Sequence, residues 1–272
     1  MKPEVIASVA DALLAAERNA AMLAPVTEWL PDFDVAAAYA VLEVIEARRR
    51  AAGWEPVGRK IGFTNRTIWA RYGVDQPMWA PTWRQTVHHA QDGKARLAIS
   101  RFVQPRIEPE VVFGVAGAMP VTDDPVAILR AVDWIAAGFE IVQSHFPDWK
   151  FKVPDCTAAF GLHAALVVGT PVRVTDANRA TLARTLPIFE VALRKNGEVI
   201  ERGVGANVLG SPALALAYLA RVLATQPGAS PLVAGEVITT GTLTDAWPAA
   251  PGDVFASDYG ELGVPGLELS LT

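Results

Sequence analysis

The sequence contains one cysteine, Cys156, among its 272 residues. An internal disulfide and a metal site built from several cysteines are therefore excluded. Positive charge is also scarce, because 24 lysines and arginines face 29 aspartates and glutamates and give a net charge of −5. Proteins that bind nucleic acids carry clustered positive charge, so we expect no nucleic-acid partner.

Long uninterrupted apolar runs are missing as well. The runs 131–142 and 158–168 are broken by Asp133 and His163, and both are shorter than the roughly 18 residues of a membrane-spanning helix. The first twenty residues carry Glu4 and Asp11, where a signal peptide would need its apolar stretch. We therefore expect a soluble, cytoplasmic protein with no membrane partner.

The signatures of several enzyme classes are absent. The chain has no phosphate-binding loop of the form G-x-x-x-x-G-K-[ST], no H-E-x-x-H and no G-x-S-x-G. The glycine-rich stretch 203–210 has the wrong spacing for a dinucleotide-binding fingerprint. These absences exclude an ATPase, a zinc protease and a serine hydrolase.

The pattern that is present is helical at first and rich in strands later. Segments 3–17 and 34–50 show the period of amphipathic helices, and Asp34 is placed to cap the second. Asn196-Gly197 predicts a type I′ hairpin within 189–201. Further strands are expected at 57–63, 110–115, 139–142, 160–168, 236–240, 253–257 and 267–271.

Three more helices are expected at 66–72, 125–137 and 211–223, the last with Ser211 as its N-cap. Residues 75–89 have no clear period, so we expect an aromatic, partly buried loop there. The pattern as a whole predicts an α+β fold in which a helical region precedes a strand-rich domain.

The segment from Arg106 to Phe113 carries the strongest chemical signal. Side chains two apart in a strand share a face, so Glu108 and Glu110 point the same way. Two carboxylates on one face repel unless a proton or a cation neutralises them. A hard divalent cation such as Mg²⁺ suits oxygen ligands, and Glu140 in another apolar strand offers a third. A solvated sheet edge remains the alternative from spacing alone.

Lys60 stands between two glycines, Gly58 and Gly62, at the end of a predicted strand. Such a lysine can approach an anionic substrate group, although a surface lysine is the alternative. Isolated candidates for a direct role are Asp155, Ser144, His88, His89, His145 and His163.

Several motifs occur together in a recognisable order. They are GRKIGFT at 58–64, GVDQP at 73–77, QPRIEPE at 104–110, FEIVQS at 139–144, GVGANVLG at 203–210, GEVITTGT at 235–242 and PGD at 251–253. Over nearly its whole length the chain resembles the 2-keto-4-pentenoate hydratase and 2-oxo-3-hexenedioate decarboxylase family of the fumarylacetoacetate hydrolase superfamily.

The resemblance implies a mixed β-sandwich or β-roll with a small helical N-terminal domain. We place that domain at residues 1–75 and the catalytic domain at 76–272, and the family implies a homo-oligomer. It also implies Mg²⁺ or Mn²⁺ as the cofactor, with the metal ligands Glu108, Glu110 and Glu140. The catalytic residues that it implies are Lys60, Asp155 and Thr240.

The implied activity is the addition of water to a 2-hydroxy-2,4-dienoate (a 2-oxo-enoate after ketonisation), which gives a 4-hydroxy-2-oxo acid in the catabolism of aromatic compounds. A 2-oxo acid decarboxylase is one alternative. A C–C bond hydrolase, in which His88 or His89 activates water, is another. An inactive binding or assembly subunit is the third, because apolar residues replace polar family residues near the expected pocket.

Those replacements are Met78, where the family commonly has an aspartate, Leu42, and the segment 158–162. We therefore expect an apolar wall that favours a substrate with an apolar or aromatic distal end. The predicted substrate-binding residues are Met78, Trp79, Phe160, Leu162 and Ser144.

Overall fold

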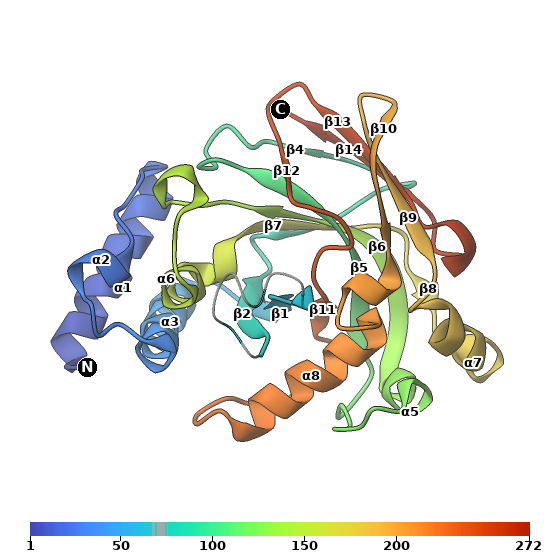
Figure 1. Ribbon diagram of the computed structural model, residues 1–272, viewed down its shortest axis with the longest axis horizontal. Helices are drawn as coiled ribbons and strands as arrows, with labels where there is room; N and C mark the ends of the chain where they lie inside the picture. Colours follow the sequence, from blue (N-terminus) through green and yellow to red (C-terminus); the bar gives the residue numbers. More distant parts are fainter. Residues whose placement is uncertain (67–68, 70–73, 75) are drawn as a thin grey trace.

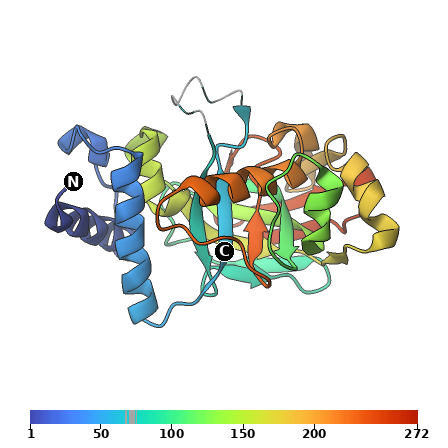
Figure 2. The ribbon, with the colours of Figure 1, turned by 90° about the horizontal axis from the view of Figure 1, so that it is seen from below.

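A computed structural model of the chain describes residues 1–66, 69, 74 and 76–272. Three helices begin the chain: α1 (Pro3–Asn19), α2 (Val26–Trp29) and α3 (Val35–Ala51). The two long helices were both predicted, and the Asp34 carboxylate accepts the Ala37 N–H at 2.8 Å, as expected of an N-cap. Figures 1 and 2 show these helices at one end of the molecule, beside α6 (Val153–Ala158).

A large mixed sheet forms the centre of the molecule. Among the described residues it has nine strands, and its main path runs β2-β1-β11-β5-β6-β7-β3. These are β2 (Met78–Trp83), β1 (Pro56–Gly62), β11 (Val237–Thr239), β5 (Arg106–Val115), β6 (Val132–Val142), β7 (His163–Val168) and β3 (Val87–His89). The short strands β12 (Trp247–Pro248) and β8 (Val172–Arg173) pair with β5 and β6.

A second sheet packs over the first. Its order is β10 (Glu198–Val204), β9 (Glu190–Lys195), β13 (Val254–Asp258), β14 (Leu267–Leu271) and β4 (Lys94–Leu97). The predicted hairpin joins β9 to β10, with Asn196 and Gly197 at φ values of 53° and 90°. Side chains of both sheets, such as Phe113 and Phe255, share one hydrophobic core. The predicted α+β fold with a β-sandwich-like body is confirmed.

The remaining helices lie around the sheets. They are α5 (Pro125–Arg130), α7 (Asp176–Thr185), α8 (Pro212–Thr225) and the short 3₁₀ helices η2 (Pro147–Trp149), η3 (Phe160–Leu162), η4 (Gly205–Asn207) and η5 (Gly260–Leu262). In the part of the chain that the structure describes, the segment Gly205–Thr225 is long and apolar enough to cross a membrane, but 67% of its most apolar window is buried inside the protein. It is therefore a core helix.

Some predicted elements were wrong. The helix expected at 125–137 ends at Arg130, because residues from Val132 onward pair with β5 and later with β7. The loop expected at 75–89 instead contains β2, whose six residues are all buried, and β3. Pro81 is tolerated in β2 because that strand ends the main path of the sheet.

Other differences are local. The strand expected at 160–168 begins only at His163, because residues 160–162 form a tight turn with φ values of 58°, 60° and 64°. Ser211 occupies the N-cap of α8, but its hydroxyl makes no capping hydrogen bond. The helix expected at 66–72 lies largely outside the described residues. The division of the chain at residue 75 stays a prediction, and β1, which precedes it, pairs with β2 and β11 in the large sheet.

Candidate active site

Three glutamates meet in the middle of the large sheet. Glu108 and Glu110 lie on β5, and Glu140 on β6 is the direct cross-strand partner of Glu108. One carboxylate oxygen from each residue lies within 4.8 Å of the others. Glu110 and Glu140 are fully buried, so a solvated sheet edge does not describe this cluster.

Lys60 reaches the same cluster from β1. Its Nζ lies 3.1 Å from Glu140 Oε2, and the residue is only 5% exposed. Burial alone would lower the pKa of this amine, but the carboxylates of Glu140, Glu108 and Glu110 outweigh it and raise the pKa above its ordinary value. Lys60 is therefore a buried cation beside the carboxylates and not a surface lysine.

The three carboxylates differ in their affinity for protons. Burial raises the pKa of Glu108 to about 7, and burial and the two neighbouring glutamates raise the pKa of Glu110 well above its usual value. Burial acts on Glu140 too, but Lys60 and His163 outweigh it and lower the pKa of Glu140 to about 2. Glu140 is thus ionised at neutral pH, whereas Glu110 holds its proton more tightly than an ordinary carboxyl group does.

The donor set fits a hard divalent cation. Glu110 Oε2 accepts the Gly241 N–H at 2.7 Å, while Glu110 Oε1 is buried and has no hydrogen-bond partner among the described residues. A buried carboxylate oxygen without a donor is costly unless a proton or a metal ion contacts it. Mg²⁺ and Mn²⁺ both prefer carboxylate oxygens, so the residues present fit the predicted metal.

Neighbouring residues hold Glu110 in place. The Tyr259 hydroxyl, which comes from the end of the second sheet, donates to the Glu110 carbonyl oxygen at 2.6 Å. Thr240 donates its hydroxyl to the Val111 carbonyl oxygen at 2.9 Å and so fixes the chain just before Gly241. Thr240 does not line the cavity beside the glutamates, and we propose a positioning role for it.

A cavity of about 240 Å³ lies beside Lys60 and Glu108. Two of the predicted substrate-binding residues, Met78 and Leu162, line it together with Trp149 and Phe151. These apolar side chains share the cavity wall with polar ones such as Thr64, Thr242 and Asp245.

Arg106 also lines this cavity, and sequence analysis did not assign it to the site. Its guanidinium carbon lies 4.2 Å from the centre of the Trp149 ring. The sequence did contain the information needed to assign Arg106 to this site. Arg106 precedes Glu108 by two residues, so the alternation that places Glu108 and Glu110 on one face of the strand places Arg106 there too.

Three other predicted substrate-binding residues point elsewhere. Trp79 alternates to the opposite face of β2 from Met78, and its indole donates to Gln226 Oε1 at 2.9 Å. Phe160 packs in the N-terminal helical core, where its ring lies 4.4 Å from the guanidinium carbon of Arg49. The hydroxyl of Ser144 donates to the Phe146 carbonyl oxygen at 3.0 Å. None of the three lines this cavity, so the structure places them away from Lys60 and the glutamates' open side.

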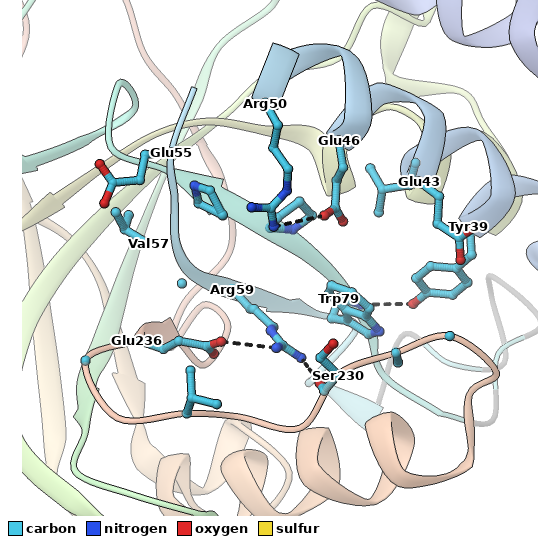
Figure 3. A pocket seen from close by; sticks show the side chains of 18 of the residues that line it. Tyr39, Glu43, Glu46, Arg50, Glu55, Val57, Arg59, Trp79, Ser230 and Glu236 are labelled. Carbon is cyan, nitrogen blue, oxygen red and sulfur yellow. Dashed lines mark hydrogen bonds and ion pairs between the residues drawn. The ribbon is translucent and has the colours of Figure 1, made fainter. Parts of the chain in front are cut away.

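Trp79 lies instead in a second pocket, of about 520 Å³, on the other face of β1 (Figure 3). Arg59, next to Lys60 in sequence, points into this pocket and donates to the Ser230 carbonyl oxygen at 2.7 Å. It also pairs with Glu236 at 3.1 Å. Alternation along β1 thus separates the two cations, and only Lys60 reaches the carboxylate cluster.

Asp155 is engaged in structural contacts. Its carboxylate accepts the backbone N–H and the hydroxyl of Thr27 at 2.8 and 2.9 Å, and the Lys152 N–H at 2.8 Å. These bonds join α2 to the start of α6. Asp155 is fully buried and does not line the cavity, so we propose a structural role for it in place of the predicted catalytic one.

The four histidines have different surroundings. His163 contacts the cluster directly, since its Nδ1 lies 2.8 Å from Glu140 Oε1. His145 contacts the Ala21 carbonyl oxygen at 2.9 Å. His88 and His89 are exposed on β3 and do not line the cavity, so the structure does not place either where it could activate water for a C–C bond hydrolase.

Residues 76–265 match the family described as fumarylacetoacetate (FAA) hydrolase C-terminal. The chain therefore belongs to the fumarylacetoacetate hydrolase family, as the sequence motifs predicted.

Individual relatives narrow the class. The chain is 32% identical over 267 residues to 2-keto-4-pentenoate hydratase of Paraburkholderia xenovorans (strain LB400), over 97% of this chain and 94% of that protein. It is 31% identical over 263 residues to 4-oxalocrotonate decarboxylase of Pseudomonas sp. (strain CF600), over 93% and 92%. Among solved structures, 4-oxalocrotonate decarboxylase from Pseudomonas putida G7, complexed with magnesium and adipate, has a TM-score of 0.89 at 27% identity and covers 100% of this chain and 99% of that one.

Proposed function

We propose that this protein is a divalent-metal-dependent hydro-lyase that adds water to a 2-hydroxy-2,4-dienoate, with a 4-hydroxy-2-oxo acid as the product, in the catabolism of aromatic compounds. The cluster of three glutamates with Lys60 at its edge supports this proposal most strongly. The similarity to a 2-keto-4-pentenoate hydratase along nearly the whole chain supports the reaction type.

Glu108, Glu110 and Glu140 would hold Mg²⁺ or Mn²⁺. When bound, the ion supplies Lewis-acid polarisation of the oxygen at C2 of the substrate. Lys60 contributes a fixed positive charge next to the cavity, where it can stabilise negative charge at the C2 oxygen or transfer a proton. Met78 and Leu162 shield the reacting carbons from bulk water.

The substrate's own chemistry sets the order of proton transfers. Protonation at C5 and loss of the C2 hydroxyl proton turn the dienol into an enone, in which C4 is electrophilic. Water then gives its hydroxyl to C4 and a proton to C3. We assign these transfers to Lys60, which borders both the cluster and the cavity, as Glu108 does.

A decarboxylase acting on a dienedioate is the second candidate. Arg106 places a guanidinium in the cavity, where it can pair with a second carboxylate. A 4-oxalocrotonate decarboxylase is similar to this chain in sequence and in structure. Cytoplasmic location and homo-oligomeric assembly remain predictions from the sequence.

The deciding experiment incubates the purified protein and Mg²⁺ with 2-hydroxydienoates, 2-oxo-enedioates and acylpyruvates and identifies the products by NMR. We expect a 4-hydroxy-2-oxo acid from the dienoates, and none after chelation of the metal. Release of CO₂ from an enedioate without hydration would favour the decarboxylase. Failure to exchange deuterium at C3 of a simple 2-oxo acid would favour an inactive binding subunit.

A further inference from the structure

His163 is a buried residue in direct contact with one of the three glutamates. It begins β7, is 3% exposed, and pairs with Val142, which follows Glu140 by two residues on β6. The Glu140 carboxylate contacts a protein group through each oxygen, because Oε1 lies 2.8 Å from His163 Nδ1 and Oε2 lies 3.1 Å from Lys60 Nζ. Neither Glu108 nor Glu110 has such a pair of partners among the residues that the structure describes.

We infer that His163 is a positioning residue, which holds the Glu140 carboxylate turned toward the cluster and so keeps Lys60 from closing on both of its oxygens. This inference rests on the proposed metal-dependent function, and it names a part of that site which neither motif spacing nor the comparisons assign.

The proton on His163 can be placed from its partner. An ionised carboxylate only accepts hydrogen bonds, so the contact with Glu140 requires the proton on Nδ1. On the other side of the ring, Nε2 lies 2.9 Å from the Thr86 hydroxyl oxygen. A ring contacted at both nitrogens cannot tilt away from Glu140 without losing a hydrogen bond.

Thr86 is itself anchored to the strand that carries His163. Its hydroxyl oxygen accepts the Trp83 N–H at 3.3 Å, and its carbonyl oxygen accepts the Leu166 N–H at 2.8 Å. Leu166 belongs to β7, as does His163. The turn that carries Thr86 is therefore fixed to β7. Because β7 also pairs with β6, the positions of Thr86, His163 and Glu140 are fixed relative to one another.

Loss of this line would leave the buried Glu140 Oε1 without its hydrogen-bond donor. A buried carboxylate oxygen without a donor is unfavourable, and the nearest cation is the Lys60 ammonium on the other oxygen. The carboxylate would then rotate to share both oxygens with Lys60. That movement withdraws one ligand from the cluster and the lysine from the cavity together.

The test compares His163→Leu with His163→Asn, whose amide nitrogen occupies the place of Nδ1 and restores the donor. Mn²⁺ binding is followed by electron paramagnetic resonance on the full-length protein. Loss of a group that orients a metal ligand typically weakens affinity 10- to 100-fold, so we expect a loss of about that size in His163→Leu. We expect His163→Asn to stay within about threefold of the parent.

His145→Leu is the matched control. His145 is buried to a similar degree but bonds the Ala21 backbone carbonyl oxygen in place of a glutamate, so its replacement tests the cost of losing a buried imidazole alone. A parent-like affinity in His163→Leu would overturn the inference. So would an equal loss in His145→Leu, or a failure of His163→Asn to restore binding.

A measurement on the parent protein covers the case in which His163→Leu does not fold. Nitrogen-15 NMR of labelled histidines is expected to show His163 protonated at Nδ1, and a ring protonated at Nε2 alone would overturn the inference. If the variants show the expected order of Mn²⁺ affinities while the parent protein hydrates no dienoate, that result supports the role of His163 and overturns the hydratase proposal. A parent protein that binds no Mn²⁺ would overturn both.

Discussion

Glu108 and Glu140 face each other directly across β5 and β6, yet only Glu140 contacts Lys60 and His163. This asymmetry sets the protonation of the pair, since burial raises the pKa of Glu108 to about 7 while the two partners, acting against burial, lower the pKa of Glu140 to about 2. At neutral pH the Glu140 carboxylate is therefore ionised, whereas Glu108 is only partly ionised.

The affinity for the metal should consequently rise with pH. A carboxyl group with a raised pKa keeps its proton below that pKa, and the proton competes with the cation for the same oxygen. Glu108 loses its proton as the pH passes about 7, so Mg²⁺ binding should tighten by up to about tenfold per unit of pH for each proton released. Calorimetry between about pH 5.5 and 8.5 measures this slope. Affinity that does not change with pH would contradict the assigned protonation.

Glu110→Gln should weaken Mg²⁺ binding and leave the fold intact. The substitution removes a carboxylate that would contact the cation, with little change in size. Burial and the neighbouring glutamates already raise the pKa of Glu110 well above its usual value, so an uncharged side chain should be tolerated there. Removing a residue that only orients a metal ligand weakens the affinity at least about tenfold. Because Glu110→Gln changes a proposed ligand itself, we expect the Mg²⁺ affinity to fall by more than that. Glu236→Gln, at a half-buried glutamate in the second pocket, is the control. Equal losses in both variants would argue against the three-glutamate site.

Lys60→Met should lower kcat more than it changes KM. Methionine keeps the aliphatic stem, but it removes the positive charge that lies beside the cavity. Removal of one group that stabilises developing negative charge costs about 10²–10³-fold in kcat. The adjacent Arg59→Met alters the other face of β1 and should mainly reduce thermal stability, because Arg59 bonds Ser230 and Glu236. A raised KM with unchanged kcat would make Lys60 a binding residue alone.

Asp155→Asn should destabilise the protein without affecting metal binding. Both carboxylate oxygens of Asp155 accept hydrogen bonds from Thr27 and Lys152. In asparagine an NH₂ group replaces one of these oxygens, so a donor would face a donor. Loss of a buried hydrogen bond of this kind costs about 1–3 kcal/mol of unfolding free energy, measured by urea denaturation. A stable variant with a much lower kcat would instead restore the catalytic role that the sequence predicted.

A dienoate with an alkyl terminus should have a higher kcat/KM than the matching dienedioate. Met78 and Leu162 cannot satisfy a second carboxylate, and an unpaired buried charge is rejected more strongly than a misfitting methylene, which costs about 1–3 kcal/mol. Arg106 is the residue in the cavity that would reverse this order. If the dienedioate reacts faster and Arg106→Met removes that advantage, the decarboxylase becomes the better assignment.

Local chemistry allowed several features to be predicted from the sequence alone. Alternation along a strand put Glu108 and Glu110 on one face, and Asn196-Gly197 specified a hairpin, because both depend on neighbouring residues only. The capping carboxylate of Asp34 is of the same kind. The apolar segment around Glu140 suggested it as a third carboxylate, and the family motifs predicted it as a metal ligand.

Tertiary structure decided what those local rules leave open. The register of β5 against β6 places Glu140 opposite Glu108, and the pairing of β2 with β1 turns Met78 to the cavity and Trp79 away from it. Asp155 accepts hydrogen bonds from Thr27 on α2, which lies 128 residues earlier in the sequence. Sheet order and register are set by contacts between distant segments, so no period within one segment reveals them. His163 became part of the site for the same reason, because only the pairing of β7 with β6 brings its ring to Glu140.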